Sequence, residues 1–250
     1  MSILNILLIL LAGTAAGFIN TLAGGGSLIT LPALITLGLP SAVANGTNRI
    51  AIMIQNIVAI SNFKNKGYFN SKLSFMLGIP AVLGSIIGAQ LAISLADAVF
   101  NRILAIVMVI MLALILWNPT KKYKNVTEKL NGKNKVIAIV AFFFVGIYGG
   151  FIQAGVGIII ITTLTLVTGF SLVKINSIKV FVVAIYMVSS LLIFIFSGNV
   201  NWILGLILAV GNGFGAWLGS TLAVSRGEKL VRIVLTFAVL MMAGNLLGLY

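Results

Sequence analysis

The chain repeats one pattern of glycines in apolar sequence, once in each half. A glycine-rich run, Ala23-Gly24-Gly25-Gly26, interrupts the first half early, and Ala154-Gly155-Val156-Gly157 interrupts the second half at the matching place. Asn45 and Asn176 are 131 residues apart. The same separation relates four small residues of the first half to four of the second: Gly67, Gly84, Gly88 and Ala92 to Gly198, Gly215, Gly219 and Ala223. Before the runs, the recurring residues are Gly13, Gly17, Phe18 and Ile19, then Gly146, Gly150, Phe151 and Ile152. This pattern predicts a duplicated unit of roughly 105 to 110 residues.

Composition predicts that both units lie in a lipid bilayer. Of the 250 residues, 60% are hydrophobic and 8% are charged, so we expect an all-α polytopic membrane protein. The first basic residue is Arg49, and residues 3–22 therefore lack the basic region of a cleaved signal peptide and are expected to be a retained helix. The chain has no His and no Cys, and we expect no metal site and no cofactor.

Ten apolar segments are expected, five in each half. They span 3–22, 27–39, 45–63, 72–94, 99–117, 136–154, 157–171, 177–197, 200–223 and 228–249. A helix needs about 20 residues to cross the hydrocarbon core, so 27–39 and 157–171 are too short to cross alone. Each is expected to join its predecessor in a broken or re-entrant hairpin, and Leu31-Pro32 supports this in the first copy. A kink is expected at Pro80.

The basic residues predict how the two copies are oriented. The expected domains are a first membrane repeat at 1–117, a basic cytoplasmic linker at 118–135 and a second repeat at 136–250. The loop around Lys64 is basic and its counterpart, 197–199, is uncharged. The second-half loop with Arg226, Lys229 and Arg232 is basic, whereas its first-half counterpart has Asp97 and only Arg102 nearby. The positive-inside rule then requires two repeats of inverted topology, with both termini outside the cytoplasm.

Charge also narrows the partners. The net charge of +13 comes from residues between apolar segments, and we interpret it as a topology signal, not a nucleic-acid surface. The three acidic residues, Asp97, Glu128 and Glu228, fall between or at the ends of apolar runs. The membrane interior therefore has no obvious carboxylate to relay protons, which favours an anionic solute over a cationic one.

The glycine-rich runs are the first candidate site. The residues are Asn20, Gly24, Gly25, Gly26 and Ser27 in the first copy, with Gln153, Gly155 and Gly157 in the second. A break frees backbone N–H groups and directs helix N-termini into the interior, where they attract an anion. The alternative is close helix packing through small residues, which is our interpretation of Gly84, Gly88, Gly215 and Gly219.

The start of the third segment of each copy is the second candidate site. Its polar residues are Asn45, Thr47, Asn48 and Arg49, and opposite them Asn176, Ser177 and Lys179. Amides, hydroxyls and one cation per copy can converge on an oxyanion. The alternative is that Arg49 and Lys179 extend to the membrane surface from helix ends. Gln55, Asn56 and Asn212 are expected to bond across helices.

The motifs resemble those of a known family. Gly17-Phe18-Ile19-Asn20, then Ala23-Gly24-Gly25-Gly26-Ser27, Leu31-Pro32 and Gly46-Thr47-Asn48 resemble the TauE/SafE family of membrane permeases, often called sulfite exporters. The likeness covers nearly the whole chain. The second copy departs from the pattern at Val156 and at Asn176-Ser177-Ile178, where family members often repeat Gly-Thr-Ser. The resemblance implies transport of small sulfur-containing anions such as sulfite or organosulfonates.

Three functions compete. The paired breaks predict a secondary transporter that moves a small anion by alternating access at a midplane site between the repeats. An anion channel, or a carrier for a small solute without sulfur, is the alternative. An enzyme is not expected, because without His and Cys the usual bases, thiol nucleophiles and metal ligands are missing. The expected partners are the solute and the bilayer, and the sequence leaves open whether the chain forms a homo-oligomer.

Overall fold

The described part of the chain is entirely helical. In a computed structural model, residues 3–117 and 132–222 form helices joined by short turns, with no strand among them. The first half contains α1 (Ile3–Ala23), α2 (Ser27–Thr36), α3 (Ser41–Asn65), α4 (Ser71–Ser94) and α5 (Asp97–Trp117). The second half contains α6 (Gly132–Phe151), α7 (Val156–Thr168), α8 (Leu172–Phe196) and α9 (Trp202–Leu222). The all-α prediction is confirmed, and nine of the expected segments correspond to these helices.

Two expectations fall wholly or partly on other residues. The tenth segment, 228–249, lies outside the described residues, together with Arg226, Lys229 and Arg232. Of the expected linker, 118–131 is also outside them, and α6 begins at Gly132, inside the expected linker.

The chain is a multi-pass membrane protein. Six helices are long and apolar enough to cross a bilayer: α1 from Ile6, α4, α5 to Ile115, α6, α8 and α9. Large apolar side chains such as Leu11, Ile79, Phe144 and Ile203 are exposed on four of them, as expected of surfaces that face lipid. α3 has 25 residues and carries the polar run of the first half.

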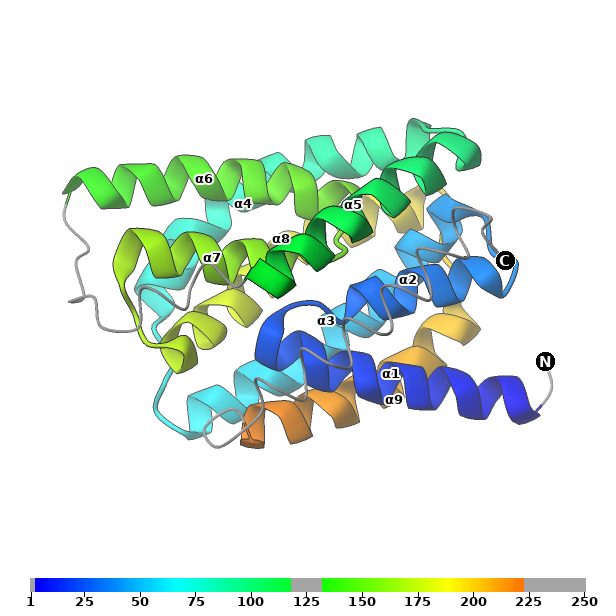
Figure 1. The fold of residues 1–250 in the computed structure, drawn as a ribbon, viewed down its shortest axis with the longest axis horizontal. Helices are drawn as coiled ribbons and strands as arrows, with labels where there is room; N and C mark the ends of the chain where they lie inside the picture. The colour runs from blue at the N-terminus through cyan, green and yellow to red at the C-terminus, as the bar shows by residue number, and fades with distance from the viewer. Residues whose placement is uncertain (1–2, 118–131, 223–250) are drawn as a thin grey trace.

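Close helix pairs join the two halves. α9 packs along α1 and α6 packs along α4, on opposite sides of the molecule (Figure 1). A Cβ at Gly84 or Gly88 would overlap the backbone of α6, and one at Gly215 would overlap the backbone of α1. Gly219 also packs tightly on α1, where a Cβ would lie 2.9 Å from the carbonyl oxygen of Phe18. These four glycines therefore have the packing role predicted for them, because the helix axes approach too closely for a side chain.

The packing exchanges equivalent helices between the halves. The first helix of each half, α1 or α6, packs against the fourth helix of the other half. The third helices follow the same rule: α3 packs against α9 and α8 against α4, while α3 and α8 contact each other. This exchange places the polar runs of α3 and α8 beside the breaks of the opposite half. The orientation of the halves relative to the membrane stays a prediction.

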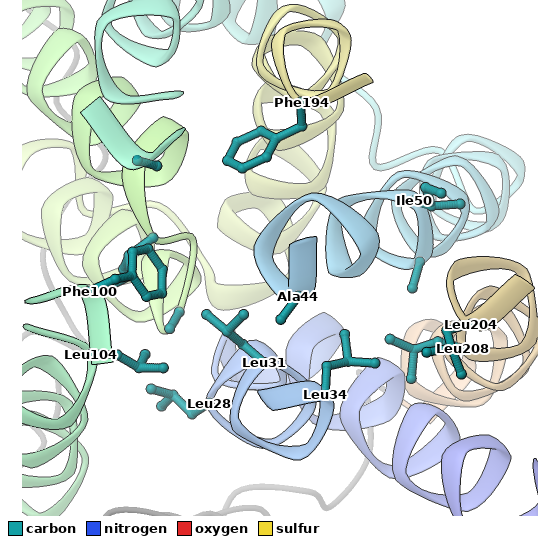
Figure 2. Packing of buried hydrophobic residues seen from close by; sticks show 14 of the residues in the cluster. Leu28, Leu31, Leu34, Ala44, Ile50, Phe100, Leu104, Phe194, Leu204 and Leu208 are labelled. Carbon is teal, nitrogen blue, oxygen red and sulfur yellow. The ribbon is translucent and has the colours of Figure 1, made fainter. Parts of the chain in front are cut away.

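The short helix α2 is enclosed by protein. Its 10 residues span about 15 Å, which is half of the hydrocarbon thickness. Leu28, Leu31 and Leu34 are buried in one cluster with side chains from α5, α8 and α9 (Figure 2). The helix continues through Pro32, so the interruption lies at the glycine run before Ser27, not at the proline. Pro80 likewise lies inside α4.

Candidate functional site

The two glycine runs meet. A Cβ on Gly24 would overlap the backbone of Gly157, and a Cβ on Gly157 would overlap the Cα of Gly24. Gly24 and Gly155 both adopt left-handed φ angles, of 81° and 74°, which suit glycine because it has no Cβ. The chain therefore turns sharply after α1 and before α7, and the two turns lie against each other.

Each turn exposes the start of a short helix. At the start of α2, the N–H groups of Leu28 and Ile29 bond to the carbonyls of Gly25 and Gly26. The first N–H groups of a helix have no partner within it, so those of Gly25, Gly26 and Ser27 are available to a ligand. At the start of α7, the N–H of Ile158 bonds to Gly155. All of these glycines and Ser27 are buried.

Arg49 of α3 holds the end of α6. Its Nη1 donates to the carbonyl of Gly149 at 3.2 Å and to Ser190 Oγ at 2.9 Å, and Nη2 donates to the carbonyl of Gly150. Nη2 also bonds to Asn45 Oδ1, and Asn45 Nδ2 donates to the carbonyl of Phe151 at 2.7 Å. The guanidinium stacks over the Phe194 ring at 4.6 Å. Arg49 is 0% exposed, so it does not extend to the membrane surface.

Lys179 of α8 holds the end of α1 in the same way. Its Nζ donates to the carbonyls of Asn20 at 2.8 Å and Thr21 at 3.0 Å, and to Asn176 Oδ1 at 2.8 Å. Asn176 Nδ2 donates to the carbonyl of Leu22 at 3.2 Å. Lys179 is 3% exposed, so it too stays inside the protein. In each half, an amide and a cation of the third helix bind the last carbonyls of the opposite first helix.

A second pair of matched contacts fixes the side chains next to the breaks. Asn20 Nδ2 donates to Gln55 Oε1 at 3.0 Å, and Tyr186 OH donates to Gln153 Oε1 at 2.7 Å. Gln153 stands where Asn20 stands in the first copy, and Tyr186 follows Gln55 by 131 residues. Gln153 is also a non-glycine residue with a positive φ, of 61°. Such strain persists only where surrounding contacts impose it.

Several buried donors on α3 have no partner. Asn48 Oδ1 accepts from Thr30 Oγ1 of α2 at 2.7 Å, which leaves Asn48 Nδ2 unpaired. Arg49 Nε and Asn56 Nδ2 are also buried without a partner. Among the described residues, the other such side-chain atoms are Ser177 Oγ and Asn212 Oδ1. An unpaired buried donor costs free energy, so these N–H groups are suited to an acceptor that the protein itself does not supply.

The structure separates some of the predicted site residues. Thr47 does not reach the breaks: its Oγ1 accepts from the N–H of Asn201, before α9. Gln55 bonds across helices, as predicted. Tyr186 was not predicted, and its matched separation from Gln55 is the signal in the sequence that points to it. Within residues 3–117 and 132–222, no three His, Cys, Asp or Glu residues gather to hold a metal.

Comparison with known proteins gives the same class of molecule. The family described as "Sulfite exporter TauE/SafE" matches residues 9–246. A "Probable membrane transporter protein YfcA" of Escherichia coli K12 is 31% identical, over 93% of this chain and 86% of that protein. A "Probable membrane transporter protein" of Haemophilus influenzae is 28% identical, over 94% of this chain and 91% of that protein.

More distant similarity extends over full length. A "Probable membrane transporter protein YunE" of Bacillus subtilis is 22% identical, over 98% of both chains. No solved structure was found to match the chain. The family match covers almost all of both repeats, including both breaks. The chain therefore belongs to the TauE/SafE family of membrane transporters.

Proposed function

We propose that the protein is a secondary transporter of a small anion, and that the substrate is a sulfur oxyanion or organosulfonate such as sulfite. The substrate binds where the two breaks meet, between two repeats of inverted topology, and crosses by alternating access. The proposed ligands are N–H groups at the starts of α2 and α7, together with the free amide of Asn48. Ser27, Ser177 and the amides of Asn20, Asn45, Gln153 and Asn176 complete the proposed site.

The observation that carries this proposal is a surplus of buried N–H donors without buried acids. Asn48 Nδ2, Arg49 Nε and Asn56 Nδ2 all lack partners, and all three belong to α3. The acidic residue of the described part of the chain, Asp97, is exposed and accepts from the N–H of Ser41. A site rich in donors and poor in carboxylates favours an anion, since an anion can accept several charge-assisted hydrogen bonds.

Sulfite fits this donor set because its three oxygens can each accept more than one N–H. The family description names sulfite, and the relatives' names specify only membrane transport. The sulfur chemistry of the substrate therefore rests on the family, whereas the negative charge of the substrate rests on the donors in the protein interior.

The test is ligand-dependent thermal stability of the purified protein. The panel contains sulfite, sulfate, thiosulfate, methanesulfonate and acetate as sodium salts, with sodium chloride at equal ionic strength as the reference. A ligand at 100 times its Kd stabilises the folded state by about 2.7 kcal/mol. We expect one sulfur anion to raise the melting temperature selectively.

A matched pair of variants locates the binding. Asn48→Asp keeps the shape of the side chain but replaces the free donor by an acceptor, and should abolish the shift. Asn199→Asp makes the same change in an exposed turn, where the side chain bonds only to Ser197, and should leave the shift intact. No shift with any anion would refute the proposed substrate class, and a normal shift in Asn48→Asp would remove Asn48 from the site.

A further inference from the structure

The two buried cations contact backbone carbonyls, not free space. Lys179 Nζ has three N–H bonds to give, and all three go to oxygen atoms: the carbonyls of Asn20 and Thr21 and the amide of Asn176. Arg49 gives both terminal nitrogens to Gly149, Gly150, Ser190 and Asn45 and keeps only Nε free. Direct capture of an anion by Lys179 would require it to release one of these oxygens.

The contacted carbonyls are the negative ends of two helices. Asn20 and Thr21 lie in the last turn of α1, and Gly149 and Gly150 lie in the last turn of α6. The carbonyls at a helix C-terminus carry a partial negative charge, and the N–H groups at an N-terminus carry a partial positive charge. A helix break places both ends side by side, so an anion attracted by the start of α2 or α7 is repelled by the adjoining end of α1 or α6.

We propose that Arg49 and Lys179 are positioning residues that neutralise these two carbonyl ends and fix them, and that neither binds the anion directly. Each cation offsets the negative end of one break, and the N–H groups of α2 and α7 then dominate the potential at the site. This inference rests on the proposed function, because it concerns the same anion site. It assigns to the cations a role different from the ligand role that their sequence positions suggest.

The cross-repeat geometry supports this role twice. Arg49 belongs to the first half and caps α6 of the second, whereas Lys179 belongs to the second half and caps α1 of the first. In both places the neighbouring amide, Asn45 or Asn176, binds the next carbonyl along the chain, at Phe151 or Leu22. Two residues of different chemistry perform one task at equivalent points.

The test compares three lysine variants by their affinity for the anion that stabilises the wild type in the panel above. Lys179→Met removes the charge and should raise the Kd at least tenfold. Lys179→Arg restores charge and carbonyl contacts and should bind within threefold of the wild type. Lys66→Met is the matched control, since Lys66 Nζ also caps helix carbonyls, Ser220 and Thr221 of α9, but far along the chain from either break. It should leave the Kd unchanged.

Each outcome distinguishes the two claims. If the wild type binds no anion, the proposed function fails, and this inference fails with it. If the wild type binds but folded Lys179→Met binds equally well, the cation only stabilises the fold and the inference alone is overturned. If Lys179→Arg loses binding as completely as Lys179→Met, lysine contacts the anion directly, which also overturns it.

Discussion

At the scale of single residues, Asn45 and Asn176 connect the two halves. Each amide donates to a carbonyl at the end of the opposite first helix and accepts from a buried cation. Replacing either by Leu leaves a carbonyl and a cation without a partner, at a cost of about 1–3 kcal/mol for each buried group. We predict that Asn45→Leu and Asn176→Leu insert into the membrane but do not transport. Flux into vesicles, normalised to inserted protein, measures this, and normal flux would remove that residue from the site.

Tyr186 supports a prediction about stability. Its hydroxyl is the partner of Gln153 Oε1, in a residue whose φ is 61°. Tyr186→Phe leaves that buried oxygen unpaired and should lower stability by about 1–3 kcal/mol. Tyr68→Phe removes a hydroxyl from a half-exposed side chain and serves as the control. Equal melting temperatures for the two variants would show that the Tyr186 contact is unimportant.

The sequence identifies some of these residues better than others. An amide in apolar sequence is conspicuous, and Asn45 and Asn176 were therefore predicted as site residues. A tyrosine is not conspicuous, because its ring is compatible with any apolar helix. The partners of Arg49 and Lys179 were not predictable either, since backbone carbonyls are present at every residue and leave no mark in the sequence.

At the scale of helices, the close approach of the two breaks can be tested with alanine. Gly24→Ala places a side chain at a left-handed φ of 81° and against the backbone of Gly157. Gly38→Ala imposes a similar φ of 91° but has nothing within 4 Å of the new Cβ. The conformational strain alone costs about 1–3 kcal/mol. We predict that Gly24→Ala lowers the melting temperature more than Gly38→Ala, and equal losses would contradict contact between the breaks.

Helix boundaries followed from the sequence more reliably than their register. The apolar runs located the described helices, and the glycine runs located both breaks. However, the glycines before the breaks match at 146 − 13 = 133, whereas the capped carbonyls match at 151 − 22 = 129. The difference of four residues is about one helical turn. Glycine spacing reports where a helix packs on its neighbour, and this does not fix where the helix ends.

At the scale of the whole molecule, charge predicts the topology. The complementary basic loops require two inverted repeats, which places both termini outside the cytoplasm. Reporter domains fused to each end, one active only in the cytoplasm and one only outside it, measure this directly. A cytoplasmic C-terminus together with an external N-terminus would break the inverted-repeat argument.

Which helices pair was beyond the sequence. Small residues four apart on α1, α4, α6 and α9 predict close packing, but any of these helices satisfies the pattern. The observed pairs, α1 with α9 and α4 with α6, join segments of opposite halves. Pairing depends on the shape of whole surfaces, and a repeat pattern read along one chain does not contain that information.

The most direct test of the central claim is counterflow in proteoliposomes. Purified protein is reconstituted, the vesicles are loaded with unlabelled sulfite or methanesulfonate, and uptake of the same radiolabelled anion is followed. A carrier with one site exposed to one side at a time predicts saturable uptake that is faster in loaded than in empty vesicles. Uptake that rises linearly with concentration and is indifferent to loading would indicate a channel. An absence of uptake for every anion that stabilises the protein would contradict anion transport.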